Sequence, residues 1–263
     1  MKVFGVSHIG NSRANNEDNF LIRKKIMDLD TIKRFSAQFP SVCQTCRGKS
    51  DNTLLAVSDG MGGHSSGEMA SYLTVKRLHE NCSEIVGNGG ADICRIISEI
   101  NRAVFDESQN NPEYKGMGAT LCGFVCGNDK IIGFNVGDSR LYRFEKGNLQ
   151  QLSKDHSEGQ RLFDLKLLNE EELKSFPKRK AIYKHIGMRT DLVADVFEIA
   201  PCSKGTVFLL CSDGLTDAIS DPEICEILDR RASLKEKGKK LLNAALERNV
   251  GHGDNITIIL TEF

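Results

Sequence analysis

The 263-residue sequence lacks three features that would each indicate a class of protein. It has almost no excess charge, since 35 basic and 36 acidic residues leave a net charge of −1, which argues against a nucleic-acid or anionic-membrane partner. It has no apolar run near the roughly 20 residues that span a bilayer, and its first residues do not resemble a signal peptide. We therefore expect a cytoplasmic protein that binds neither nucleic acid nor membranes.

The sequence also lacks internal repeats, low-complexity segments and any linker that would divide it. Hydrophobic residues make up 40 % of the chain, which is enough for one sizeable core, so we predict a single domain over residues 1–263. The nine cysteines are an odd number. Most lie in apolar stretches, and in a cytosolic chain they are expected to be reduced core residues.

Cys43 and Cys46 form a CxxC pair outside the apolar stretches. Such a pair is half of a zinc knuckle or a redox motif. Structural zinc sites need four ligands, and no second CxxC or nearby pair of histidines follows. We interpret the pair as two thiols in a surface loop.

Hydrophobic patterning predicts many short strands and a few long helices. Helices are predicted over residues 67–80, 92–107, 220–230 and 233–248. Strands are predicted over residues 3–7, 20–22, 54–57, 120–125, 131–136, 141–144, 149–152, 195–199, 206–211 and 256–261. Residues 24–53 are interpreted as an insertion whose weak amphipathic pattern favours one helix. This mixture predicts the α+β class, with helices packed on antiparallel sheets.

The stretch over residues 54–68 contains one carboxylate in a position where ionisation is unfavourable. Its apolar run predicts a buried strand that ends at Ser58-Asp59-Gly60. An ionised carboxylate at the tip of a buried strand costs free energy unless a cation or hydrogen-bond donors surround it. Asp59 is therefore a candidate metal ligand, which the carbonyl of Gly60 can join. The alternative is a strand-to-helix turn, in which Asp59 forms an Asx turn and glycine supplies positive φ.

The pattern of a carboxylate beside an apolar run recurs along the chain. Asp138 and Asp213 each follow a predicted strand, and Asp254 and the pair Glu17-Asp18 each precede one. If these strand ends converge, the site is strongly anionic and offers only oxygen ligands, which suits Mg²⁺ or Mn²⁺. Two such ions about 3.5–4 Å apart activate water for in-line attack on phosphorus.

Two further side chains suit phosphate chemistry. Arg13 offers a planar, bidentate donor to a phosphate group. His64 follows Asp59 closely and can protonate a leaving alkoxide. Alternatively, His64 is a loop residue that hydrogen-bonds to the backbone, and a metal-bound water protonates the leaving group.

Five motifs along nearly the whole chain resemble, in order, those of the metal-dependent PP2C-type (PPM) protein serine/threonine phosphatases, in particular the bacterial branch. They are Arg13-x-x-Asn16-Glu17-Asp18, Asp59-Gly60-Met61-Gly62-Gly63-His64, Gly137-Asp138-Ser139-Arg140, Ser212-Asp213-Gly214-Leu215 and Asp254-Asn255-Ile256-Thr257. The resemblance implies a four-layer α-β-β-α sandwich, with two antiparallel sheets flanked by helix pairs. It also implies that water activated at a binuclear Mn²⁺ or Mg²⁺ centre hydrolyses phosphoserine and phosphothreonine on proteins, with no phosphoenzyme. The implied partners are phosphorylated proteins and an opposing serine/threonine kinase.

The resemblance further implies metal ligands. Asp59 would bridge two ions, and the Gly60 carbonyl would bind the second. Asp213 and Asp254 would hold the first ion. Asp138, with Asp213, matches positions that bind a third ion.

Other residues would act around the metal ions. Glu17 and Asp18 would act through metal-bound waters, and Arg13 would bind the substrate phosphate. His64 is the candidate proton donor.

Three segments depart from the family pattern. Ala119 stands where a threonine hydroxyl is usual, near the sheet that supports the site. Residues 155–190 align with a mobile flap that shapes substrate choice, and their final run, 180–187, differs from the usual sequence. The insertion at 24–53 is atypical, and we hypothesise that it docks a partner.

Two other functions remain as alternatives. One is a non-catalytic, phosphatase-like domain that binds phosphoproteins, although such domains typically lose metal aspartates that are all present here. The other is a hydrolase of another phosphoester, such as a nuclease, although the chain has no basic stripe.

Overall fold

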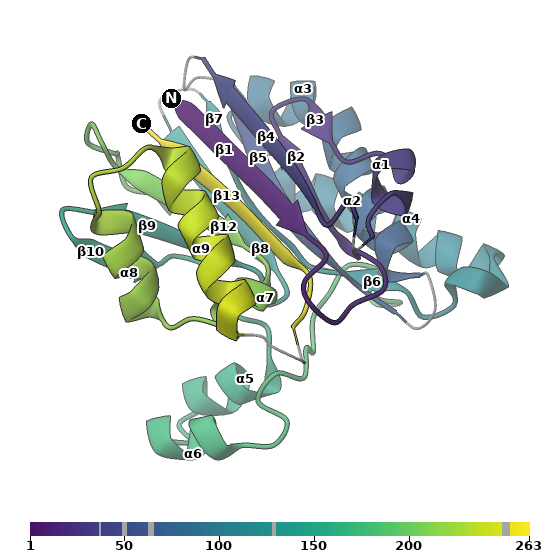
Figure 1. Ribbon diagram of the computed structural model, residues 1–263. Coiled ribbons are helices and arrows are strands. Elements are labelled where there is room, and N and C mark those ends of the chain that lie inside the picture. The colour runs from purple at the N-terminus through teal and green to yellow at the C-terminus, as the bar shows by residue number, and fades with distance from the viewer. Residues whose placement is uncertain (37, 49–51, 63–65, 128–129, 249–252) are drawn as a thin grey trace.

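Two antiparallel β-sheets pack face to face and carry helices on their outer surfaces (Figure 1). This computed structural model describes residues 1–36, 38–48, 52–62, 66–127, 130–248 and 253–263. The predicted four-layer α-β-β-α arrangement is confirmed. Among the described helices, none is both long and apolar enough to cross a membrane.

The first sheet has the strand order β10-β9-β12-β13-β1-β4, and the second has the order β11-β8-β7-β5-β2-β3 with β6 paired to β5. The strands of the first sheet are β1 (Lys2–His8), β4 (Ser41–Arg47), β9 (Arg140–Glu145), β10 (Asn148–Gln151), β12 (Val207–Cys211) and β13 (Ile256–Glu262). Those of the second are β2 (Asp18–Ile22), β3 (Lys25–Ile26), β5 (Thr53–Met61), β6 (Gly118–Ala119), β7 (Leu121–Gly127), β8 (Lys130–Val136) and β11 (Asp195–Ile199).

The helices divide between the two outer surfaces and a projecting segment (Figure 1). Those that pack on the second sheet are α2 (Gly67–Glu80), α3 (Cys82–Gly87) and α4 (Ile93–Asn110). Those that pack on the first sheet are α7 (Asp213–Thr216), α8 (Asp221–Asp229) and α9 (Leu234–Arg248). The projecting segment contains α5 (Glu158–Asp164) and α6 (Glu170–Ser175), and the short α1 (Leu29–Lys33) follows β3.

Three hydrophobic clusters hold these layers together. The cluster between the sheets includes Phe20, Phe124 and Phe208, all at most 2 % exposed. The outer cluster on the second sheet contains the apolar face of α4 that the periodicity predicts, from Ile93 to Val104. These are the residues whose spacing of three and four places them on one side of a helix.

The strand that carries Asp59 is longer than its apolar run predicts. β5 continues past the predicted end at Ser58-Asp59-Gly60 to Met61, one residue further than predicted. The extra residues find a partner in β6, where Gly60 pairs with Ala119. A two-residue strand made of Gly118 and Ala119 leaves almost no hydrophobic pattern to detect.

The segment 24–53 is also more ordered than an insertion loop. Its predicted helix is present as α1, but β4 was not predicted and pairs with β1 along its whole length. Cys43 and Cys46 therefore lie on an edge strand, and the prediction of a surface loop was wrong. Residues three apart in a strand point to opposite faces, so Cys43 is exposed while Cys46 packs against the cluster between the sheets.

Candidate metal centre

Five aspartates from five separate parts of the chain lie near one another at one end of the two sheets. Asp18 begins β2 and is the register partner of Asp59 in β5. The charges of four others, Asp18, Asp213, Asp138 and Asp254, all raise the pKa of Asp59, after the larger effect of its burial. The structure thus brings together the aspartates that the sequence predicts at strand ends.

Burial and mutual repulsion make these carboxylates unusually hard to ionise. Burial, assisted by the charges of Asp254 and Asp213, raises the pKa of Asp18 to about 7. Burial, followed by the charge of Asp217, raises the pKa of Asp213 to about 6. Burial also raises the pKa of Asp138 well above its usual range. Such a concentration of negative charge favours protons or cations.

Two oxygen atoms in the centre have no partner at all among the described residues. They are Oδ1 of Asp18 and Oδ1 of Asp213, both buried. The other oxygen of Asp18 accepts a hydrogen bond from Ser212 Oγ at 2.7 Å. Buried polar atoms are normally satisfied, and an oxygen-only donor set suits Mg²⁺ or Mn²⁺, so these residues fit the implied ions.

Arg13 and Asp254 contact each other, although the sequence predicts that one binds phosphate and the other metal. Arg13 Nη2 lies 2.6 Å from Asp254 Oδ2, and the backbone N–H of Asn255 donates to Asp254 Oδ1 at 2.8 Å. In the described part of the chain, no three acidic, thiol or imidazole side chains form a ready-made cage for an ion. Asp254 is paired with Arg13 instead.

Glu17 and Gly60 meet the beginning of helix α2. The Gly67 N–H donates to the Glu17 carboxylate, and the Gly60 N–H donates to the backbone carbonyl of Glu17 at 3.1 Å. A Cβ on Gly60 would lie 2.0 Å from the carbonyl oxygen of Gly67. Position 60 therefore requires glycine because strand and helix approach too closely for a side chain. Burial raises the pKa of Glu17.

His64, the predicted proton donor, lies outside the described residues. Its role therefore stays a prediction.

A chain of buried hydroxyl groups supports Asp59 and was missed in the sequence. Thr120 Oγ1 accepts from the Asp59 N–H at 2.9 Å and shares a 2.7 Å hydrogen bond with Ser139 Oγ. The Thr120 N–H donates to the Asp59 carbonyl at 2.8 Å. Ser139 directly follows Asp138. The hydrogen bonds through Thr120 therefore connect the strand that carries Asp59 to the loop that carries Asp138. The departure from the family pattern lies at the neighbouring Ala119, but Thr120 makes these contacts.

Replacing Thr120 with valine is expected to lower kcat about 10- to 100-fold, the usual effect of losing a group that orients a metal ligand. Valine keeps the shape of threonine but leaves the Asp59 N–H without its acceptor. A phosphatase assay over a range of Mn²⁺ concentrations measures both kcat and the half-saturating Mn²⁺ concentration. Thr53→Val is the matched control, because the Thr53 hydroxyl is also buried in β5 but has no hydrogen-bond partner among the described residues. Equal kinetics in both variants would contradict the role of Thr120.

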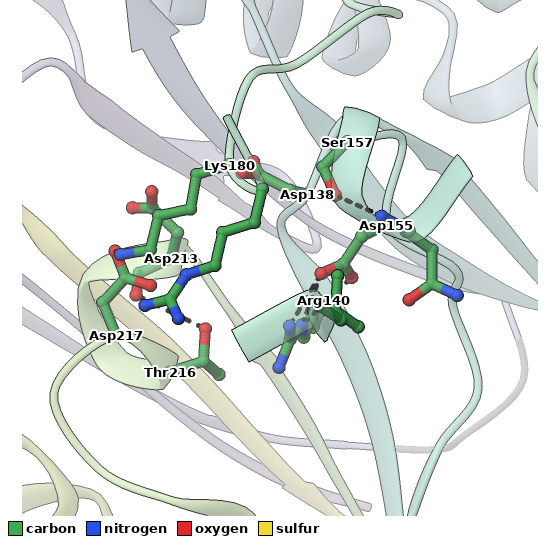
Figure 2. Close-up of a pocket in the computed structure, with 11 residues that line it drawn as sticks. Asp138, Arg140, Asp155, Ser157, Lys180, Asp213, Thr216 and Asp217 are labelled. Carbon is green, nitrogen blue, oxygen red and sulfur yellow. Dashed lines mark hydrogen bonds and ion pairs between the residues drawn. The ribbon is translucent and has the colours of Figure 1, made fainter. Parts of the chain in front are cut away.

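A pocket of about 240 Å³ adjoins the centre, between the projecting segment and α7 (Figure 2). Asp138 and Asp213 line one side of it, and Gln160 and Leu173 of the projecting segment line another. The projecting segment corresponds to the flap predicted at residues 155–190. The pocket therefore lies where the flap meets the aspartates.

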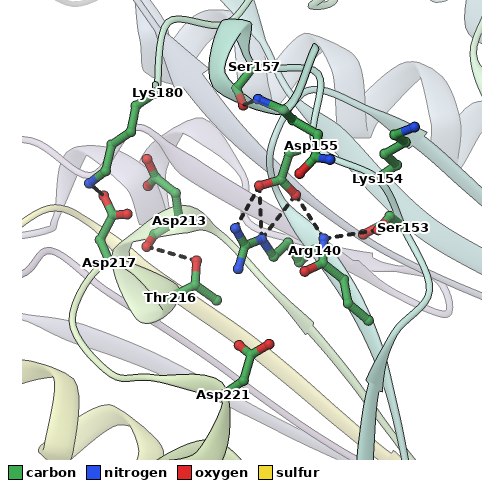
Figure 3. A network of polar contacts seen from close by, with 12 residues as sticks. Arg140, Ser153, Lys154, Asp155, Ser157, Lys180, Asp213, Thr216, Asp217 and Asp221 are labelled. Carbon is green, nitrogen blue, oxygen red and sulfur yellow. Dashed lines mark hydrogen bonds and ion pairs between the residues drawn. The ribbon is translucent and has the colours of Figure 1, made fainter. Parts of the chain in front are cut away.

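Two ion pairs form part of the pocket wall (Figure 3). Arg140 binds both carboxylate oxygens of Asp155, with its closest contact at 2.7 Å. Lys180 pairs with Asp217 of the segment that follows α7. The first pair holds Asp155 against β9 of the first sheet. The second pair connects the flap to the segment after α7.

A buried histidine connects the base of the flap to the aspartates. His156 Nδ1 accepts a hydrogen bond from the Gly137 N–H at 2.9 Å, and Gly137 directly precedes Asp138. On its other side, His156 Nε2 lies 3.2 Å from Asp195 of β11. Burial lowers the pKa of His156, so the neutral ring holds the flap base against the loop that carries Asp138.

The chain matches the family model described as protein phosphatase 2C over residues 42–250. It is 31 % identical over 219 residues to the serine/threonine phosphatase stp of Listeria monocytogenes serotype 4b, which covers 81 % of this chain and 86 % of the relative. The solved serine/threonine phosphatase of S. agalactiae is 28 % identical, with a TM-score of 0.82 and coverage of 99 % and 98 %. The PstP catalytic domain, solved in complex with two manganese ions, is 27 % identical, with a TM-score of 0.72 and coverage of 100 % and 99 %.

Proposed function

The chain belongs to the protein phosphatase 2C family, and we propose that its converging aspartates form the metal centre of a bacterial-type member. It is a metal-dependent protein serine/threonine phosphatase that uses Mn²⁺ or Mg²⁺. The assignment of the centre to these residues is supported chiefly by one observation. Two buried aspartate oxygens, on Asp18 and Asp213, have no hydrogen-bond partner in the described chain.

Asp59, Asp213 and Asp254 would hold two metal ions, together with the carbonyl of Gly60, and Asp138 would share a third with Asp213. When bound, such ions lower the pKa of a water molecule and neutralise phosphoryl oxygens. The protein's own contribution is orientation. Thr120 and Ser139 hold the backbones of two ligands, and Ser212 holds Asp18.

Arg13 would bind the substrate phosphate. Its side chain is about half exposed, at 49 %, so it can reach a ligand from solvent. Its hydrogen bond to Asp254 keeps the guanidinium beside the aspartates and raises its pKa further. If Asp254 held a metal ion, Arg13 would lose its carboxylate partner, and its planar donor group would be free to bind phosphate. Glu17 would act through metal-bound water, and His64 would donate a proton to the leaving group.

The substrates would be phosphorylated proteins of the cytoplasm, whose phosphate is added by an opposing serine/threonine kinase. The phosphatase names of the relatives support phosphoprotein substrates. The pocket beside Asp138 and Asp213 offers room for residues that flank the phosphorylated one.

The proposed function is tested by a phosphatase assay with phosphothreonine and phosphotyrosine peptides of the same sequence, with and without Mn²⁺. We expect turnover that requires Mn²⁺ and favours phosphothreonine. Turnover without a divalent metal ion would contradict the metal centre. Binding of phosphopeptide without any hydrolysis in Mn²⁺ would instead favour the non-catalytic alternative.

A further inference from the structure

Three cationic side chains line the pocket beside Asp138 and Asp213, and they differ in their partners. Figure 2 labels two of them, Arg140 and Lys180. Arg140 is neutralised by Asp155 and Lys180 by Asp217. The third, Arg179, forms no ion pair with any carboxylate in the described part of the chain. Its guanidinium therefore lines the pocket without an ion-pair partner among the described residues.

The position of Arg179 is set by the packing of the flap. The Arg179 carbonyl accepts from the Gly159 N–H at 3.2 Å, and the Arg179 N–H donates to the Phe176 carbonyl at 3.1 Å. A Cβ on Gly159 would lie 2.8 Å from the Cα of Arg179, so glycine permits this close approach to α5. The backbone of Arg179 is thus held against the first turn of a helix.

The guanidinium of Arg179 is also held. Its Nη1 donates to the backbone carbonyl of Lys174, near the end of α6, at 2.5 Å. A guanidinium has five N–H donors, so this single bond orients the group and leaves the others for a ligand. An arginine that is already oriented loses less side-chain entropy on binding than a freely rotating one.

The charges around the pocket favour an anion at Arg179. Asp155 and Asp217 are already paired with cations, and Asp138 and Asp213 are the carboxylates assigned above to metal ions. A planar guanidinium binds carboxylate and phosphate groups through two parallel hydrogen bonds. Because Asp138, Asp213 and Arg179 line the same pocket, a side chain that flanks a phosphorylated residue bound at the centre would come within reach of Arg179.

We propose that Arg179 binds an anionic side chain that flanks the phosphorylated residue, so that the enzyme prefers acidic or multiply phosphorylated substrates. This inference rests on the proposed function, because the same pocket serves both. It assigns to one residue the role in substrate choice that the resemblance implies for the flap as a whole.

The test compares three phosphothreonine peptides that differ only in the flanking residues, which are alanine, glutamate or phosphoserine. The Mn²⁺-loaded protein should give about tenfold higher kcat/KM for an anionic peptide than for the alanine peptide, the size expected for one charged hydrogen bond. Arg179→Ala should lower this ratio of kcat/KM values to about one, and Arg179→Lys should retain part of the preference. Lys178→Ala is the matched control, because Lys178 is the adjacent exposed cation but does not line the pocket.

A second measurement is inhibition by the unphosphorylated glutamate peptide, which should weaken in Arg179→Ala but not in Lys178→Ala. A preference for the glutamate peptide alone or for the phosphoserine peptide alone identifies which anion the site takes. Equal ratios in the wild-type and Arg179→Ala proteins would overturn the inference. p-Nitrophenyl phosphate has no flanking residues, so its hydrolysis tests the proposed function separately from the role of Arg179. If the wild-type protein does not hydrolyse p-nitrophenyl phosphate, the proposed function is contradicted. If it does, but the kcat/KM ratio between anionic and alanine peptides is the same in Arg179→Ala, only the role of Arg179 is contradicted.

Discussion

The Asp213→Asn variant is expected to lose about a hundred- to ten-thousand-fold of its Mn²⁺-dependent turnover of p-nitrophenyl phosphate. Metal ions supply several kcal/mol of transition-state stabilisation, and each 1.36 kcal/mol corresponds to about tenfold in rate. Asparagine removes the charge while preserving the shape of the side chain. Calorimetric titration with Mn²⁺ should show weaker binding in parallel with the lost activity.

Asp213→Asn should fold at least as well as the wild-type protein. Asp213 is repelled by Asp217 and Asp254, so its neutralisation relieves repulsion and should raise the melting temperature in EDTA. Asp229→Asn, at an exposed aspartate that ends α8, is the control and should keep wild-type activity. Undiminished Mn²⁺-dependent turnover in Asp213→Asn would refute the proposed centre.

The metal-free protein is expected to be less stable at pH 8 than at pH 5.5. Burial raises the pKa of Asp18 from 3.8 to about 7 and that of Asp213 to about 6. Between about pH 4 and pH 7 the folded state therefore binds more protons than the unfolded state, so the free energy of unfolding falls as pH rises. Thermal melts in EDTA should show a decrease of roughly 5–10 °C across this range.

Mn²⁺ should reverse this trend, because the ions bind the deprotonated carboxylates and compete with protons. The increase in melting temperature on adding Mn²⁺ should be larger at pH 8 than at pH 5.5. Asp18→Asn should flatten the pH dependence in EDTA, whereas the exposed Asp229→Asn should leave it unchanged. A melting temperature in EDTA that rises from pH 5.5 to pH 8 would show that these carboxylates are not held in a repulsive cluster.

Much of the fold follows from local patterns. The apolar face of α4 has a helical period, and β7 and β8 are two apolar runs that lie close together in the sequence and pair antiparallel, so both were predicted. The strands β4 and β6 were missed because one alternates weakly and the other has two residues. Their existence depends on the partners β1 and β5, which lie far away in the sequence.

The sequence by itself determined the chemistry of this protein. Carboxylates at the ends of apolar strands are a local pattern, and the order of five motifs was enough to indicate a metal-dependent phosphatase. Only the tertiary structure decided which groups contact one another. The bond from Arg13 to Asp254 joins residues 241 positions apart, and the bond from Asp59 to Thr120 joins residues 61 apart. Hydrophobic periodicity does not predict such contacts, because they form where the two stacked sheets and the flap bring separate strand ends together.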